Sequence, residues 1–228
     1  MWRCWPGWSP SLLGSLLEIA LCTGDIRASF EFYEQLGFGN AVTGDIWTHH
    51  YGVMACEGLC LGLHEKRQPS PTIVFTRENV AALARELDAL GIAVLNARLG
   101  EDVFNELSLR DPSGLVLRVL EARSFSPPSE PPGVTALGRF ESLSLPLRDV
   151  EAAAAFWQVL GIATPPVAYH APKLHDEPLL QFRQPDLAQA AARLSALGVD
   201  CAPGFGGFAP PEHLLLTSPE GQRIALLA

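Results

Sequence analysis

The sequence lacks the features of a nucleic-acid-binding protein. Lys and Arg total 16 against 25 Asp and Glu, the formal net charge is −9, and the pI is near 5.1. The basic residues form no run along the chain. Because binding to a phosphate backbone needs clustered positive charge, we expect no nucleic-acid partner. The expected partner is a small molecule or another copy of the protein.

The sequence also lacks a pattern of paired cysteines. Its five cysteines show no CxxC and are odd in number: Cys4, Cys22, Cys56, Cys60 and Cys201. A disulfide framework is therefore not expected, and we interpret the closely spaced pair Cys56 and Cys60 as small buried side chains. This composition favours a reducing, cytoplasmic location.

An export signal is not expected either. The apolar segment 12–22 follows Arg3, but Glu18 interrupts it and no small-residue cleavage site comes after it. The segment aligns with an internal segment, 140–147, so we predict a strand and no membrane partner.

Several catalytic motifs are missing. There is no P-loop, no nucleophile elbow, and no GxGxxG between a strand and a helix. The glycine-rich segment 204–208 has no helix after it, so it is interpreted as a loop at the mouth of a cleft.

What the chain does contain is an internal repeat. The pattern that starts at Asp25 and ends with Leu36-Gly37-Phe38 returns 124 residues later, ending with Leu160-Gly161-Ile162. Asp111-Pro112-Ser113-Gly114 returns 107 residues later as Ser218-Pro219-Glu220-Gly221. Leu36-Gly37 also matches Leu90-Gly91 within the first half. Repetition of one supersecondary unit predicts four equivalent units.

Each unit opens with a strand that is followed by a helix and further strands. In the first half we expect strands at 16–22, 43–48, 51–56, 59–64, 72–75, 93–96, 104–110 and 115–121, and helices at 26–36 and 78–90. Equivalent helices are expected at 150–160 and 185–197. The predicted organisation is an N-terminal arm (1–13), a first domain (14–122), a Pro-rich linker (123–138) and a second, shorter domain (139–228).

Strand alternation assigns the faces of the first sheet. Leu17, Ile19 and Leu21 should point one way, and Glu18 and Ala20 the other. By the same rule, Gly62 and His64 oppose the leucines of their strand, and Arg118 opposes Leu117 and Val119. We expect the apolar face to pack on the helices and the mixed face to line a concave surface.

These residues resemble the vicinal oxygen chelate superfamily, which includes glyoxalase I, extradiol dioxygenases and bleomycin resistance proteins. The resemblance rests on Asp25 seven residues after Glu18, the helix end FYEQLGF, and the strand turn DPSGLVLRVLE. It implies an α+β fold of four βαβββ units. These would form two similar domains packed as an internal pseudo-dimer, with a cleft that often holds a divalent metal.

The chain departs from this family at the positions of the metal ligands. The resemblance places those positions on the first strand of each unit, at Glu18, Thr72, Ser142 and Leu179, and on last strands, at Gly62, Arg118 and Ala225. Metal sites need three or four converging N, O or S donors. We therefore expect no metal at the family's position and no cofactor.

Glu18 and Arg118 are the sharpest candidate pair, because each places a charge on the inward face of a strand. Three interpretations remain open: a salt bridge that replaces the metal, contact with a polar ligand, or acid–base chemistry by Glu18.

Further candidate ligand-binding residues are Trp47, His49, Tyr51, His64 and Glu106. The aromatic rings and imidazoles of the segment 47–51 suit an aromatic ligand, although such a segment is also typical of a turn with an exposed histidine. His64 and Glu106 face inward in the predicted strands.

The favoured function is binding of a small, aromatic molecule in the cleft of the first domain without the family's metal. The second domain, with Ser142, Leu179 and Ala225, is interpreted as a structural partner. One alternative is a metal-dependent lyase or ring-cleaving dioxygenase whose ligands are displaced, for example to Glu18, His49, His64 or Glu106. Whether the chain is an enzyme stays open. Another alternative is association through the Trp-rich N-terminus. The protein is expected to be a monomer with an internal pseudo-dimer or a homodimer.

Overall fold

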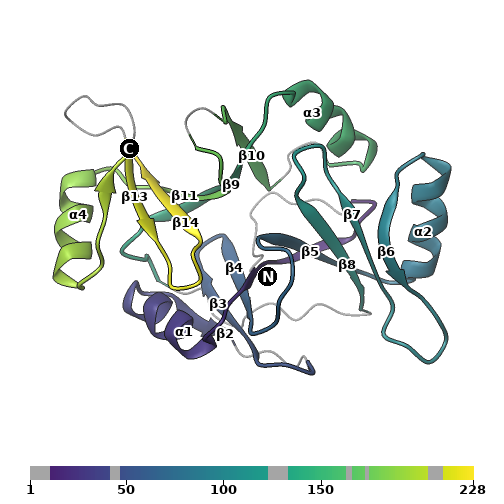
Figure 1. Cartoon of the computed structure of the whole chain (residues 1–228), viewed down its shortest axis with the longest axis horizontal. Helices are drawn as coiled ribbons and strands as arrows, with labels where there is room; N and C mark the ends of the chain where they lie inside the picture. The colour runs from purple at the N-terminus through teal and green to yellow at the C-terminus, as the bar shows by residue number, and fades with distance from the viewer. Residues whose placement is uncertain (1–10, 42–46, 123–132, 163–165, 173–174, 205–212) are drawn as a thin grey trace.

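The computed structural model describes residues 11–41, 47–122, 133–162, 166–172, 175–204 and 213–228. These residues form two mixed sheets and four helices, an α+β arrangement (Figure 1). The first sheet has the strand order β2 (Gly39–Ala41), β3 (Tyr51–Cys56), β4 (Leu59–His64), β1 (Ser15–Cys22), β5 (Thr72–Arg77), β8 (Val116–Glu121), β7 (Glu106–Arg110) and β6 (Val94–Arg98).

The second sheet repeats this plan with fewer strands. Its order is β10 (Val167–His170), β9 (Arg139–Pro146), β11 (Leu179–Arg183), β14 (Arg223–Leu227), β13 (His213–Thr217) and β12 (Ala202–Pro203). In both sheets the first strand of one unit pairs antiparallel with the first strand of the next, β1 with β5 and β9 with β11. This is the predicted two-domain fold of repeated units.

The four helices begin and end in the same way. They are α1 (Ile26–Gln35), α2 (Val80–Ala89), α3 (Val150–Val159) and α4 (Leu187–Ala196). Each begins after an Asp or Asn whose side chain accepts a hydrogen bond from the backbone amide three residues later, as Asp25 does from the Ala28 amide. Each is followed by a glycine with positive φ, between 70° at Gly91 and 92° at Gly37. These repeated signals explain why the helices are predictable to within two residues.

One continuous apolar core lies between the sheets and the helices. Ile19, Leu21, Leu61 and Leu63 belong to it, as predicted, together with Tyr33 of α1. A β-bulge interrupts the β1–β5 register between Leu16 and Glu18. Leu17 therefore packs on the opposite face, with Ala20, Val74 and Leu120, and its predicted orientation is wrong.

The two halves contact each other reciprocally. The Leu12 amide donates a hydrogen bond to the Leu160 carbonyl at 3.1 Å, and the Ala136 amide donates to the Leu36 carbonyl at 2.8 Å. The four positions are related by the repeat spacing of 124 residues. The two domains therefore contact each other through equivalent backbone hydrogen bonds, as expected for an internal pseudo-dimer.

Side chains extend this reciprocity. From α1, the Tyr33 hydroxyl donates to Glu220, in the β13–β14 turn, at 2.6 Å. From α3, the equivalent Trp157 donates to the Tyr169 hydroxyl at 2.8 Å, and Tyr169 lies beside Asp111, in the β7–β8 turn. Burial is the main cause that raises the pKa of Tyr169 to about 12, and the charge of Asp111 adds to it.

Some expectations fall on residues outside the description. These include most of the N-terminal arm, the linker residues 123–132, most of the expected strand at 43–48, and most of the glycine-rich loop. Leu13 and Leu137, which were assigned to the arm and the linker, are fully buried in the core. Among the described helices, none is long and apolar enough to cross a membrane.

Two cysteine expectations differ in outcome. Cys56 is buried with a free thiol, as predicted. Cys60 is buried too, but it is disulfide-bonded. Its interpretation as a small buried hydrophobic side chain without a bond is therefore wrong, and the lack of paired cysteine spacing did not exclude a disulfide.

Candidate functional site

Glu18 is the centre of a buried polar network on the face of the first sheet that lies opposite the helices, called the site face below. One carboxylate oxygen accepts a hydrogen bond from the Tyr51 hydroxyl at 2.7 Å. The other lies 3.1 Å from Nε2 of His64. Glu18 is 2% exposed and His64 1% exposed, so the carboxylate depends on these two partners for solvation.

Neighbouring strands bring these side chains together. β4 pairs with both β1 and β3, and Tyr51 lies directly opposite His64 in the β3–β4 ladder. Such cross-strand pairs have adjacent Cβ atoms on one face, which explains the ring separation of 4.5 Å between Tyr51 and His64.

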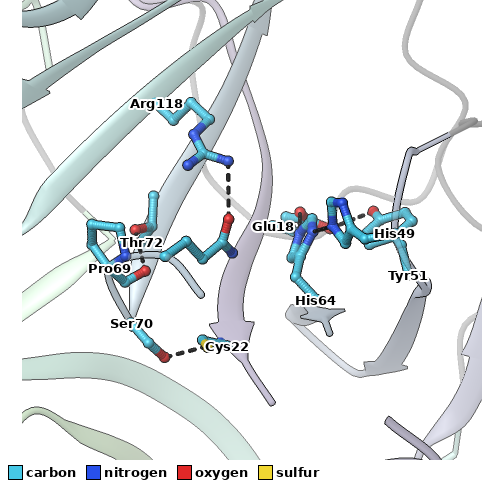
Figure 2. A network of polar contacts seen from close by, with 10 residues as sticks. Glu18, Cys22, His49, Tyr51, His64, Pro69, Ser70, Thr72 and Arg118 are labelled. Carbon is cyan, nitrogen blue, oxygen red and sulfur yellow. Dashed lines mark hydrogen bonds and ion pairs between the residues drawn. The ribbon is translucent and has the colours of Figure 1, made fainter. Parts of the chain in front are cut away.

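His49 and Trp47 complete this network. Nε2 of His49 lies 2.9 Å from Nδ1 of His64, which makes a chain from Glu18 through His64 to His49 (Figure 2). The Trp47 ring centroid is 5.2–5.5 Å from those of His49, Tyr51 and His64. Trp47 also packs against the apolar patch of Ala20, Val74 and Leu120. Five of the seven candidate residues are therefore in mutual contact: Glu18, Trp47, His49, Tyr51 and His64.

A glycine makes room for the carboxylate. A Cβ at position 62 would lie 2.2 Å from the carboxylate carbon of Glu18, closer than any real Cβ contact. Glu18 therefore occupies the space that a side chain at position 62 would need.

Arg118 belongs to a separate network, so the salt bridge between Glu18 and Arg118, one of the three interpretations that the sequence left open, is wrong. Arg118 donates to the side-chain oxygen of Gln68 at 3.2 Å, and the described residues contain no ion pair between Arg118 and Glu18. The register explains why: Glu18 lies opposite Val74 on β5, and Val74 lies opposite Arg118 on β8. Two strand spacings, roughly 10 Å, separate the two residues. Figure 2 shows the two networks apart, on either side of the β1 ribbon.

Two other predicted positions stand apart from Glu18. Thr72 donates its hydroxyl hydrogen bond to the Pro69 carbonyl at 2.8 Å. Glu106 lies opposite Leu120 on β7, three strands from β1, and the structure does not bring it to the Glu18 network.

The electrostatics of the site face favour a neutral His49. Burial is the main cause that lowers the pKa of His49, and electrostatic interactions with His64, Lys66, Arg118 and His50 lower it further. An imidazole in this environment is a free base at neutral pH.

Three buried nitrogens on this face have no hydrogen-bond partner among the residues that the structure describes. They are Nε1 of Trp47, Nδ1 of His49 and Nε2 of Gln68. A buried polar atom without a partner costs about 1–3 kcal/mol, so three of them on one sheet face, divided between its two networks, are uncommon in a purely structural arrangement.

The residues present do not fit the divalent metal that the fold family implies. Glu18 already binds Tyr51 and His64, and Arg118 brings a positive charge to its position. No cluster of three or more His, Cys, Asp or Glu suited to a metal ion occurs in the described part of the chain. Glu18, His64 and His49 form a line of contacts rather than a set that converges on one point.

Sequence reasoning missed Gln68 and the role of Gly62. Gln68 follows an exposed charged turn, and nothing in the local pattern predicts its contact with Arg118. The role of Gly62 could have been predicted, because a glycine inside a strand often marks a position that another group approaches closely.

The equivalent face of the second domain carries different chemistry. Ser142 donates a hydrogen bond to Gln181 at 2.9 Å. Leu179, Leu215 and Ala225 form a small apolar cluster on this face.

Comparisons with known proteins agree with this architecture. Residues 15–119 match the model of the Glyoxalase/Bleomycin resistance protein/Dioxygenase superfamily. The first domain belongs to this superfamily. No match to a curated protein sequence was found.

Solved structures extend the likeness to both domains. A catechol 2,3-dioxygenase superposes with a TM-score of 0.57 and 16% identity, covering 93% of this chain and 86% of that one. The Mn(II)-bound glyoxalase from Novosphingobium aromaticivorans gives 0.56 and 14%, covering 92% and 80%. The 2,3-dioxygenase LapB from Pseudomonas sp. KL28 gives 0.57 and 14%, covering 93% and 91%. At this identity the likeness shows the two-domain fold of the vicinal oxygen chelate superfamily, and not an activity.

Proposed function

We propose that the first domain binds a small aromatic molecule on its site face without a metal ion. The observation that carries this proposal is the position of Glu18. Its carboxylate lies over Gly62, within hydrogen-bonding distance of Tyr51 and His64. The one carboxylate at the family's metal position is thus already engaged by protein groups.

The chemistry around the network supports an aromatic ligand. Trp47 and Tyr51 place half-buried aromatic rings on this face, and Trp47 packs against the buried apolar patch of Ala20, Val74 and Leu120. Aromatic pairs contribute about 0.5–1.5 kcal/mol beyond the area that they bury. A planar ligand can use these surfaces without any metal.

Polar groups would orient such a ligand. The buried nitrogens of Trp47, His49 and Gln68 can each form one further hydrogen bond, and Arg118 adds a positive charge beside Gln68. A ligand that carries oxygen atoms on an aromatic ring matches this combination. The second domain, in this account, supports the first and binds no equivalent ligand.

Titration calorimetry with two probes, nitrobenzene and 4-nitrophenol, tests this proposal in the presence of a chelator. We expect the wild type to bind both probes, because neither contact set needs a metal. Trp47→Ala should weaken binding by at least tenfold, which corresponds to about 1.4 kcal/mol. Ser142→Ala, on the equivalent face of the second domain, should leave binding unchanged.

The rival function gives a different result. A metal-dependent lyase or dioxygenase would bind these probes only after Mn²⁺, Fe²⁺, Ni²⁺ or Zn²⁺ is added back. Probe binding that is absent with chelator and restored by one of these ions would overturn the proposal.

A further inference from the structure

The buried chain Glu18–His64–His49 ends on a ring nitrogen without a partner. Tyr51 and His64 occupy the two oxygens of Glu18, and His49 occupies the second nitrogen of His64. Nδ1 of His49 is buried and has no hydrogen-bond partner in the described part of the chain. The chain therefore has one unfilled end, and that end lies beside Trp47.

The order of donors and acceptors along the chain determines what this end can do. An ionised carboxylate only accepts hydrogen bonds, so Nε2 of His64 must carry the proton that faces Glu18. In the neutral ring, Nδ1 of His64 is then an acceptor, and Nε2 of His49 must donate to it. Neutral His49 consequently has a free lone pair on Nδ1. The unfilled end is a base.

We propose that His49 accepts a proton from a weakly acidic hydroxyl group of the ligand, of the phenol or enol class. The resulting positive charge would be held on His64 beside Glu18. This inference rests on the proposed ligand site and specifies the chemical class of the ligand.

The proton transfer balances without any further reactant. The O–H bond of the ligand breaks, and an N–H bond forms at Nδ1 of His49. The proton on Nε2 of His49 passes to Nδ1 of His64, so His49 ends neutral and His64 becomes an imidazolium. The ligand gains one negative charge and the histidine pair gains one positive charge.

The geometry favours this final state. The imidazolium lies 3.1 Å from the Glu18 carboxylate, and both groups are almost completely buried, so their attraction is weakly screened. The carboxylate also retains its hydrogen bond from Tyr51. Buried charge is thus paired at the inner end of the chain.

Other charged groups around His49 act in the same direction. Lys66, His50 and Arg118 are the further positive groups that act on it. They disfavour a second positive charge on His49 itself and favour an anionic ligand in front of it. Burial is the main cause that lowers the pKa of His49, and a lowered pKa favours the neutral ring that the proposed proton transfer requires.

The absorbance of 4-nitrophenol provides the first test, because the phenolate absorbs at longer wavelength than the phenol. At one pH unit below the pKa of the free probe, about a tenth of it is phenolate. We expect the probe bound to the wild type to be mostly phenolate at that pH, a rise of fivefold or more. His49→Gln keeps a donor to His64 but lacks the base, and should bind the probe as the neutral phenol.

A matched control uses the adjacent histidine. His50 is 81% exposed and pairs with Glu65, outside this chain. Because His50 makes the smallest of the electrostatic contributions to His49, His50→Gln should bind the probe and give a phenolate band close to that of the wild type. Glu18→Gln removes the buried negative charge and should reduce the band while binding persists.

The outcomes separate the two proposals. Binding of both probes, with no phenolate band in the wild type, would overturn the proton transfer and leave the ligand site intact. An equal phenolate band in the wild type and His49→Gln would do the same. Failure of both probes to bind would count against the ligand site itself.

Nuclear magnetic resonance of ¹⁵N-labelled histidines in the full chain tests the relay without any ligand. At neutral pH we expect bare Nδ1 and protonated Nε2 on both His49 and His64. Single His→Gln variants assign the two rings. A proton on Nδ1 of His49 at neutral pH would overturn the inference, whatever the probes do.

Discussion

The two domains share one backbone plan, but among the described residues only the first carries a buried carboxylate on its site face. In the first domain, Glu18 on β1 is buried against Tyr51 and His64. In the second, the equivalent Ser142 on β9 bonds to Gln181. Both faces carry a histidine at the equivalent position, His64 and His170, but His64 contacts a buried carboxylate, whereas His170 contacts the Ser144 hydroxyl at 2.8 Å.

This difference separates the features that the fold requires, which both domains share, from the buried carboxylate, which only the first domain has in the part of the chain that the structure describes. The backbone hydrogen bonds between the domains occur as an equivalent pair, Leu12 with Leu160 and Ala136 with Leu36. The fold therefore needs the repeated backbone and core, and it does not need a buried carboxylate. A buried ionic network on one face alone costs desolvation energy that the second domain avoids. We attribute that cost to ligand binding.

Removing a partner of Glu18 should produce the largest contrast between the domains. His64→Leu leaves a buried carboxylate without its imidazole, and should lower the free energy of unfolding by about 3 kcal/mol. Gln181→Leu removes a hydrogen bond between neutral groups in the second domain, and should cost about 1 kcal/mol. Urea unfolding measures both. If Glu18→Leu/His64→Leu is no more stable than His64→Leu, the carboxylate is not the source of the loss.

Filling the space over Gly62 should have the next largest effect. Gly62→Ala places a Cβ against the Glu18 carboxylate and should cost about 2 kcal/mol, as overpacking does. Gly24→Ala is the control, because a Cβ at that position meets no atom within 4 Å. Adding Glu18→Ala to Gly62→Ala should recover part of the loss. Equal melting temperatures for the two single glycine variants would contradict the position of the carboxylate.

The reciprocal domain interface offers a smaller contrast. Tyr33→Phe removes a hydrogen bond to the carboxylate of Glu220, and should cost about 1.5 kcal/mol. Glu220→Gln keeps an acceptor and should cost less. In the other half, Tyr169→Phe removes the acceptor of Trp157 within the second domain and the contact with Asp111 across the interface, and should cost about as much as Tyr33→Phe. Thermal unfolding of the three variants tests these values, and a loss for Glu220→Gln as large as that for Tyr33→Phe would contradict them.

The smallest expected effect is the pH dependence that Asp111 of the first domain contributes. Burial is the main cause that raises the pKa of Asp111, whereas the equivalent Ser218 does not titrate. Since the native pKa lies above the unfolded one, the protonated group favours the folded state. This contribution is complete below the unfolded pKa of about 3.9 and is lost as the pH rises through the native pKa.

Asp111→Asn removes that titration. Its oxygen can still accept from the amides of Ser113 and Leu115, as Asp111 does. From acid toward neutral pH, the stability of the wild type should therefore fall relative to Asp111→Asn. A constant difference between the two proteins over this range would show that Asp111 does not titrate abnormally.

Local signals made most of the fold predictable. A capping Asp or Asn and a terminal glycine bracket each helix, and the repeat places the four units in order. Alternation assigned Ala20, His64 and Arg118 to the correct face. It failed at Leu17, because a β-bulge adds a residue without any mark in the sequence.

The candidate site was less predictable, because its contacts depend on strand order. From the sequence, Glu18 has one clear charged partner, Arg118. The structure instead inserts β5 between them and places β4, with His64, on the other side of β1. The contact of Arg118 with Gln68 spans 50 residues and has no local signal. The candidate residue types could be chosen from the sequence, but which of these side chains contact each other depends on the strand order.

Elemental analysis of untagged protein, after dialysis against Mn²⁺, Fe²⁺, Ni²⁺ or Zn²⁺ and then against buffer, tests the central claim most directly. Our account predicts a substoichiometric content of every metal, with no difference between the wild type and Glu18→Gln. A stoichiometric amount of one metal in the wild type, lost in Glu18→Gln, would contradict the account and identify Glu18 as a metal ligand.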